Sequence, residues 1–304
     1  MDQGRWDKAN FARLQTILDG PPGLAAFDFD NTLIYNDLGE ACMYHLARRG
    51  LLPVRDPAFQ SGLVDSRYHT EAEGARVLEL AAGLSGQDAA ENDRFAAEAL
   101  GLYDRIYEQA DLLTTYLWSR VFFMGRTPEE LSALAREVLG DELKRAVGFE
   151  ELRGTEPDHV QRLPAGIRIV PEVAALIRVL LERDWRVRIV TASPRLVIAP
   201  VAERWGLRPE DVTGMELAVG SDGKLLPEVL DPMPCRAGKV TALRAVADVG
   251  DRPLKLAAGD SIGDWELLAE AEHAIFFDRG KPELRARAAE RGFLIEKQFP
   301  PVDG

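Results

Sequence analysis

Short apolar runs alternate with amphipathic stretches in two parts of this 304-residue chain. Strands that are buried on both faces of a parallel sheet have nearly continuous apolar sequences, and five segments are expected to form them: 24–29, 187–190, 212–213, 254–258 and 274–277. The apolar spacing of an amphipathic helix is found in the segments 5–19, 171–183, 194–205, 238–249 and 263–271. This alternation predicts an α/β fold, in which a parallel sheet carries helices on both faces.

Two other segments have different patterns. The stretch 214–230 (GMELAVGSDGKLLPEVL) predicts a β-hairpin, with turn residues 220–223 between two alternating arms. The region 36–165 is rich in Ala, Leu and Glu, and helical spacing predicts helices over 38–50, 70–83, 88–124 and 128–145. We therefore expect a core built from residues 1–35 and 166–304, with an inserted all-helical cap domain at 36–165.

The charge of the chain narrows the class of its partners. The formal net charge is −13, which argues against nonspecific binding to nucleic acid and against binding to an anionic membrane surface. A small anionic substrate is still compatible, because a metal ion and one lysine reverse the sign locally.

Cysteine usage and hydropathy indicate a cytoplasmic protein. Cys42 and Cys235 lie far apart and form neither a disulfide framework nor a zinc-binding spacing, so we expect inert thiols. The first residues lack the apolar core of a signal peptide, and no run of about 18 apolar residues predicts a membrane span. The sequence leaves the oligomeric state open.

Two aspartates lie one residue apart where the first apolar run stops, in the stretch Asp28-Phe29-Asp30-Asn31-Thr32. A buried carboxylate is costly unless it is paired or holds a metal, and ligands of open α/β sheets lie beyond the carboxyl ends of strands. Mg²⁺ prefers hard oxygen ligands, so we expect Asp28 and Asp30 at a Mg²⁺ site. Asp28 has a second oxygen that can act as nucleophile, and Asp30 can serve as general acid and then as base. We expect Thr32 to support this pair.

A second segment ends an apolar run in a hydroxyl residue, in the stretch Ile189-Val190-Thr191-Ala192-Ser193-Pro194. The Thr191 hydroxyl, together with the backbone at Ala192 and the following helix start, can bind phosphate oxygens. Lys239, which follows Gly238 at the start of another predicted helix, can balance the charge of the nucleophile and of a phosphate.

The last of these segments is Leu256-Ala257-Ala258-Gly259-Asp260-Ser261-Ile262-Gly263-Asp264. An apolar run again ends in a carboxylate, so Asp260 can complete the metal ligands. Asp264 can orient that ligand shell or accept a hydrogen bond from Lys239, and Ser261 lies between the two acids.

Each segment alone has a simpler structural interpretation. A capped strand-to-turn transition explains Asp28 and Asp30, a helix N-cap explains Ser193, and a solvated surface residue explains Lys239. A turn followed by a capped helix explains Asp260 and Asp264. The order of the four segments along the chain favours the catalytic interpretation over these alternatives.

That order resembles the four motifs of the haloacid dehalogenase superfamily: an apolar strand with DxDxT, a strand ending in Thr, a Lys, and a strand with GDxxxD. The resemblance covers roughly residues 20–35 and 165–280. It implies a Rossmann-like core, Mg²⁺ and an aspartyl-phosphate intermediate. Asp28 would be the nucleophile, Asp30 the acid and base, Thr191 and Lys239 phosphate ligands, and Asp260 a metal ligand. A second aspartate at Asp30 is typical of the phosphatases rather than the dehalogenases of the superfamily.

The large insertion between the first two motifs resembles the phosphoserine phosphatase-like branch, which has a helical cap of the first type. GMELAVGSDGKLLPEVL and NDLGEACMYHLARRG are also similar to that branch, and VTASP and WSRVFFMGR are similar to its phosphorylcholine phosphatase members in particular. Two positions depart from the phosphoserine phosphatases. Asp37 stands where they carry a glutamate nine residues after the nucleophile, and Gly263 stands where they carry an asparagine. These departures argue against phosphoserine itself.

The leading hypothesis is a phosphoric monoester hydrolase that acts on a small phosphorylated metabolite. Asp37 and Glu40 can receive a cationic head group, to which aromatic residues would add cation–π contacts. The candidate aromatic residues are Tyr35, Tyr44, Trp118, Phe122 and Phe123. All except Tyr35 lie in predicted helices, where such residues more often form the apolar core of the cap. Two other functions stay open, a phosphotransferase or mutase with the same motifs, and a non-catalytic binding protein on the same scaffold. The intact set of Asp28, Asp30, Lys239 and Asp260 argues against the last.

Overall fold

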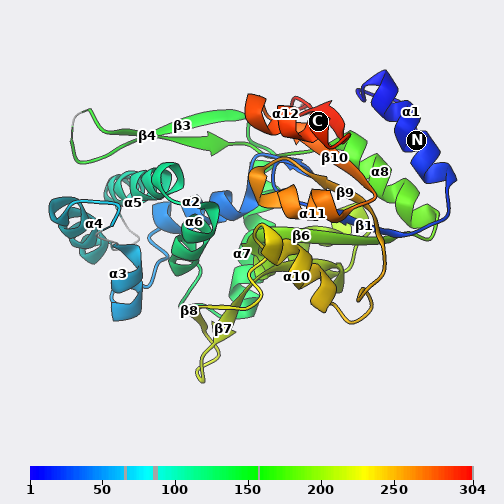
Figure 1. The fold of residues 1–304 in the computed structure, drawn as a ribbon. Helices are drawn as coiled ribbons and strands as arrows, with labels where there is room; N and C mark the ends of the chain where they lie inside the picture. Colours follow the sequence, from blue (N-terminus) through cyan, green and yellow to red (C-terminus); the bar gives the residue numbers. More distant parts are fainter. Residues whose placement is uncertain (65–66, 85–87, 157, 303–304) are drawn as a thin grey trace. The chain divides into compact units, whose positions relative to one another are not determined.

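A computed structural model describes residues 1–64, 67–84, 88–156 and 158–302 (Figure 1). Contacts between Cα atoms divide the chain into two compact units. The core unit contains residues 1–37, 167–215 and 231–304, and the insert unit contains residues 38–166 and 216–230. In the part of the chain that the model describes, no helix has both the length and the apolar character needed to cross a membrane.

The main sheet is mixed and has seven strands in the order β11-β10-β9-β1-β6-β7-β8. All neighbours are parallel except β7 and β8, which form the predicted antiparallel hairpin. The strands are β1 (Leu24–Phe27), β6 (Arg186–Pro194), β7 (Val212–Val219), β8 (Leu225–Leu230), β9 (Leu254–Gly259), β10 (His273–Asp278) and β11 (Leu294–Lys297). The α/β fold with a parallel sheet is therefore confirmed.

Helices cover this sheet on both faces (Figure 1). They are α1 (Lys8–Asp19), α8 (Pro171–Glu182), α9 (Arg195–Ile198), α10 (Ala237–Ala245), α11 (Trp265–Glu270) and α12 (Pro282–Glu290). The chain crosses from β1 to β6 in one direction and returns past β1 to reach β9. Because such crossovers are right-handed, α8 and α10 lie on opposite faces.

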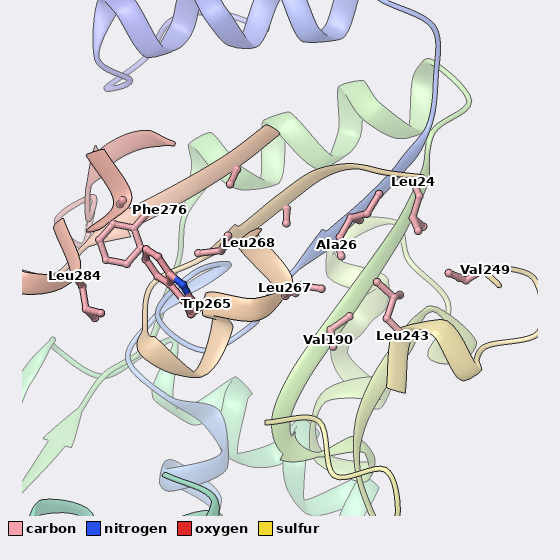
Figure 2. Close-up of a cluster of buried hydrophobic side chains, with 14 residues drawn as sticks. Leu24, Ala26, Val190, Leu243, Val249, Trp265, Leu267, Leu268, Phe276 and Leu284 are labelled. Atoms are coloured by element: carbon pink, nitrogen blue, oxygen red, sulfur yellow. The ribbon is translucent and has the colours of Figure 1, made fainter. Parts of the chain in front are cut away.

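One face of the sheet is buried under α10, α11 and α12 (Figure 2). Leu24 and Ala26 alternate on β1 and contact a cluster that includes Leu243 of α10, Trp265 of α11 and Phe276 of β10. Burying a side chain of this size contributes about 1.5 to 3 kcal/mol. The cluster holds β1 and β9 rigidly against the helices, and the candidate site residues follow directly after these strands.

Two predicted helices are wrong in extent. The segment 88–124 is not one helix, because α5 (Ala89–Gln109) ends and α6 (Leu112–Ser119) begins after Asp111, whose carboxylate accepts a bond from the Thr114 amide. The segment 194–205 is also divided, since β6 continues to Pro194 and only α9 is α-helical. Residues 199–205 form a 3₁₀-helix, in which Pro200 lacks the N–H that an α-helix would use.

The region 36–165 is not all-helical. Besides α2 (Leu38–Arg48), α3 (Pro57–Leu63), α4 (Glu71–Gly83), α5, α6 and α7 (Pro128–Glu142), it contains the strands β3 (Gly148–Arg153) and β4 (Val160–Ala165). These strands pair antiparallel, with Leu152 opposite Gln161. In β4, Gln161, Leu163 and Ala165 are buried at alternate positions, a period of two that the helical pattern around it obscured.

The hairpin segment 216–230 groups with the insert unit rather than with the core, to which the sequence analysis assigns it. Backbone bonds explain this grouping, because the Gly125 amide donates to the Leu225 carbonyl and the Leu225 amide donates to Arg126. The side chain of Arg120 also donates to the Pro227 carbonyl. These partners are about a hundred residues apart in sequence, so local patterns contain no signal for them.

Candidate active site

Three neighbouring parallel strands bring the predicted site residues to one edge of the sheet. β1 pairs with β6 on one side and with β9 on the other, so that Phe27 lies opposite Ile189 and Ala258. Asp28 and Asp260 directly follow β1 and β9, and Thr191 lies two residues beyond Ile189 in β6. Parallel strands share one carboxyl edge, and crevices at this edge are where open α/β sheets bind ligands.

A buried ion-pair network lies at the centre of this edge. The Nζ atom of Lys239 donates to Asp28 Oδ1 and to Asp264 Oδ1, each at 2.6 Å. The Thr32 hydroxyl donates to the other oxygen of Asp28 at 3.2 Å. The Lys239 side chain is only 3% exposed. One buried lysine therefore bridges two carboxylates.

Asp264 organises the loop after β9. Its Oδ2 atom accepts bonds from the amides of Asp260 and Ser261 and from the Ser261 hydroxyl, at 3.2, 2.9 and 2.8 Å. With Lys239 on Oδ1, both oxygens of Asp264 are engaged. Asp260 instead accepts a bond on Oδ2 from Arg279 at 3.0 Å.

Asp30 and Thr191 are connected through Ser193. The Ser193 hydroxyl donates to Asp30 Oδ2 at 2.7 Å, while the Ser193 amide donates to Thr191 Oγ1 at 3.1 Å. All three side chains are buried, as is Ala192. Ser193 thus holds Asp30 beside the β6 edge, and it does not act as the helix N-cap that its position before Pro194 suggests.

The electrostatics of the site show a shortage of positive charge. Burial, and then the nearby Asp264 carboxylate, raise the pKa of Asp28 well above its ordinary value, against the lowering effect of Lys239. Burial and Asp264 also raise the pKa of Asp260 to about 7, although Arg279 opposes this. For Lys239, burial alone would lower the pKa, but Asp264 and Asp28 together raise it. Neighbouring acids thus favour the positive charge of Lys239, whereas burial and neighbouring acids disfavour the negative charges of Asp28 and Asp260.

A divalent metal ion bound at this site would supply the positive charge that the acids lack. Carboxylate oxygens of Asp28, Asp260 and Asp264 all lie within 4.8 Å of one another and are buried. These three carboxylates are bonded to the basic side chains of Lys239 and Arg279. A hard, all-oxygen donor set is suited to Mg²⁺. In the described residues Asp30 is outside this carboxylate group, and it accepts a hydrogen bond from Ser193.

The backbone before α10 brings Lys239 to the acids. Arg236 adopts a positive φ of 54°, and its amide donates to the Gly263 carbonyl at 2.9 Å, which ties this turn to the loop after β9. Gly238 passes so close to the Met233 carbonyl oxygen that a Cβ atom would overlap it.

We therefore expect Gly238→Ala to destabilise the protein by about 1 to 3 kcal/mol, because a backbone oxygen cannot move aside like a side chain. Urea unfolding would measure this loss. Gly140→Ala is the matched control, since a Cβ atom there meets open space inside helix α7 and is expected to stabilise by about 0.5 to 1 kcal/mol. A Gly238→Ala protein as stable as the wild type would contradict this reading of the turn.

The two acids predicted to bind a cationic head group belong to different units. Asp37 is the last residue of the first core segment, and Glu40 belongs to α2 of the insert unit. Glu40 accepts hydrogen bonds from the hydroxyls of Tyr44 and Tyr103, at 2.8 and 3.0 Å. Four of the candidate aromatic residues are buried in the insert unit: Tyr44, Trp118, Phe122 and Phe123. This burial is typical of apolar core, which is the alternative that the sequence left open.

Two residues of the site are absent from the sequence-based set of site residues. Ser193 carries a recognisable signal, because it lies two residues after Thr191 in the same motif. Arg279 has none, since its bond to Asp260 depends on the pairing of β9 with β10. Both cysteines are buried, and within the described residues they form no disulfide.

Comparison with known proteins identifies relatives of this arrangement. The model of the haloacid dehalogenase-like hydrolase family matches residues 108–269, more than half of the chain. Protein CicA of Caulobacter vibrioides is 43% identical over 109 residues, which are 33% of this chain and 46% of that protein. Phosphoserine phosphatase of Streptomyces coelicolor is 26% identical over 227 residues, 71% of this chain and 54% of that protein. The chain thus spans about half the length of the curated relatives it matches.

Solved structures share the fold. A conserved protein of unknown function from Anaerococcus prevotii is similar with a TM-score of 0.78 at 19% identity, over 98% of this chain and 97% of its own. A probable phosphoserine phosphatase from Vibrio cholerae is similar with a TM-score of 0.50 at 16% identity, over 95% of this chain and 63% of its own. At such identities the likeness concerns the fold alone.

Proposed function

Because this chain belongs to the haloacid dehalogenase-like hydrolase family, we propose that it is a Mg²⁺-dependent phosphatase that hydrolyses a small phosphomonoester. The observation that carries the proposal is the position of Asp28. It follows strand β1, it is bonded to Lys239 at 2.6 Å, and it lies in a buried group with Asp260 and Asp264. The phosphoserine phosphatases among the similar proteins support the reaction class.

In the first step, a carboxylate oxygen of Asp28 attacks phosphorus in line with the leaving group. A new O–P bond forms while the bond from phosphorus to the substrate alcohol breaks. Asp30 gives its proton to the departing oxygen, and the Ser193 hydroxyl keeps the Asp30 carboxyl oriented through its bond to Oδ2. The product of this step is an aspartyl-phosphate and a free alcohol.

In the second step, Asp30 takes a proton from a water molecule, and that water attacks phosphorus. The bond from phosphorus to Asp28 breaks, which releases inorganic phosphate and restores both aspartates. Lys239 stays charged in both steps because its pKa is raised by the acids around it. It therefore balances charge on Asp28 and does not exchange protons. Mg²⁺ bound among the buried carboxylates would supply further positive charge against the phosphoryl oxygens.

We propose a small phosphorylated metabolite as substrate, with a cationic head group of the phosphocholine or phosphoserine type as the class to test first. Asp37 and Glu40 motivate this choice. The tyrosine hydroxyls on Glu40 reduce its capacity for a ligand.

The test is phosphate release with and without Mg²⁺ across a panel of phosphomonoesters. The panel contains phosphocholine, phosphoethanolamine, phosphoserine, sugar phosphates and nucleotides. Mg²⁺-dependent release from at least one of them supports the proposal, and a preference for amines supports the head-group assignment. If the substrate is consumed with little free phosphate and a second alcohol becomes phosphorylated, the protein is a phosphotransferase instead.

The metal assignment predicts a specific dependence of stability on pH. Folded Asp260 has a pKa of about 7, above the value of roughly 4 for an unfolded aspartate. The folded state therefore holds the proton more tightly, and stability falls as pH rises from about 4 through 7. Asp28, whose pKa is also raised, changes stability in the same direction.

We expect the melting temperature in EDTA to fall between pH 5 and pH 8, and Asp260→Asn to make this fall shallower. Added Mg²⁺ should raise the melting temperature more at pH 8 than at pH 5, because its ligands must be deprotonated. Differential scanning fluorimetry measures both effects. If added Mg²⁺ leaves the melting temperature at pH 8 unchanged, the metal site is contradicted.

A further inference from the structure

Arg279 contacts the buried acid that follows β9, and the reaction proposed above gives it no role. Its Nη1 atom donates to Asp260 Oδ2 at 3.0 Å. The Asp260 side chain is 4% exposed, whereas that of Arg279 is 42% exposed. No donor to the other oxygen, Oδ1, is found within the described ranges. Arg279 therefore engages one of the two oxygens of Asp260 from the solvent side.

The fold determines this contact through strand pairing and a tight turn. β9 and β10 are parallel with Phe276 opposite Gly259, so that the chain beyond β10 emerges beside Asp260. The Asp278 carboxylate then accepts a bond from the Gly280 amide at 2.8 Å, and Gly280 adopts a φ of 83°. Arg279 lies in this turn, directly after β10, and its side chain reaches Asp260 at the carboxyl edge of the sheet.

The number of oxygens that a carboxylate offers discriminates between divalent cations. Ca²⁺ accepts six to eight oxygen ligands in flexible geometry and often binds both oxygens of one carboxylate. Mg²⁺ is smaller and requires near-octahedral coordination, usually with one oxygen from each carboxylate. A carboxylate with one oxygen already held by an arginine can therefore serve Mg²⁺ better than Ca²⁺.

We infer that Arg279 is a positioning residue that determines the cation selectivity of this site, by holding Asp260 Oδ2 so that only Oδ1 is offered to a metal. The inference rests on the metal site of the proposed function, not on the identity of the substrate. It differs from a purely electrostatic role. The positive charge of Arg279 repels Mg²⁺ and Ca²⁺ alike, so its loss would strengthen both, whereas loss of the hydrogen bond favours Ca²⁺ specifically.

The test measures the dissociation constants of Mg²⁺ and of Ca²⁺ by isothermal titration calorimetry, on the full chain and without substrate. We expect Arg279→Met to reduce the preference for Mg²⁺ over Ca²⁺ by roughly tenfold, the lower end of what loss of a partner of a metal ligand produces. Arg279→Lys, which keeps a charged donor, should retain more of the preference. Arg285→Met is the matched control, because Arg285 follows the same strand but pairs with Asp278 at 3.7 Å.

If Arg279→Met changes the dissociation constants of Mg²⁺ and Ca²⁺ by the same factor, the inference is overturned and Arg279 has only a charge effect. A wild-type protein that binds neither cation would also overturn it. The proposed function fails separately. If the wild type shows the predicted selectivity but releases no phosphate from any substrate, the phosphatase assignment is wrong while the role of Arg279 stands. Because Arg279 is partly exposed, both variants should fold, and melting curves verify this.

Discussion

Asp28→Asn is expected to abolish phosphate release, with a loss of at least about 10⁴-fold in turnover, the scale seen when a catalytic nucleophile is removed. An amide has no carboxylate oxygen that can attack phosphorus, and Asp30, the next carboxylate along the chain, has the acid–base role. The same substitution should not unfold the protein. Burial raises the pKa of Asp28 well above its ordinary value, which means that folding makes the ionised carboxylate more costly. A neutral asparagine removes that cost.

Phosphate release and thermal unfolding, measured on the same preparation, separate the two effects. The Asp28→Asn protein should melt no lower than the wild type in EDTA at pH 7.5. Asp251→Asn, an exposed acid of the core unit, controls for the loss of one negative charge and should keep full activity. A folded Asp28→Asn protein with normal Mg²⁺-dependent turnover would falsify the assignment of the nucleophile.

Lys239→Met is expected to destabilise the protein by about 3 to 5 kcal/mol at pH 7.5, the range observed when one partner of a buried ion pair is removed. Lys239 is bonded to two buried carboxylates, and its side chain is almost fully enclosed. Methionine fills a similar volume but leaves Asp28 and Asp264 without their shared cation. This stability loss is separate from the loss of activity that the same variant should show.

The loss should shrink at lower pH. Burial and Asp264 raise the pKa of Asp28, and loss of Lys239 removes an effect that lowers it, so protonation of Asp28 as the pH falls removes much of its repulsion with Asp264. Urea unfolding at pH 5 and at pH 7.5, in EDTA, measures this difference. Lys297→Met, at an exposed position at the end of β11, is the control. Equal stability of Lys239→Met and wild type at pH 7.5 would show that the lysine is not the counter-charge of the acids.

Local sequence patterns were sufficient for the central strands of the sheet, whereas the edge strand β11 was not predicted. Nearly continuous apolar runs such as 254–258 form central parallel strands because both faces of such a strand are covered. The hairpin at 220–223 was also predictable, since its turn chemistry is local. The helical pattern led to wrong predictions where a helix cap or a hairpin interrupts it. The Asp111 cap interrupts a long helical run, and the β3–β4 hairpin lies inside a region whose composition favours helix.

Local sequence is enough to point to the side chains that could do chemistry, because Asp28, Asp260 and Lys239 each stand at a strand end or a helix start that neighbouring residues define. How these groups are combined depends on the packing of the whole fold. The bond from Ser193 to Asp30 spans two strands, and the bond from Arg279 to Asp260 spans two others. Both depend on which strands are neighbours and in which register, which arises from packing over the whole sheet and is encoded in no single segment.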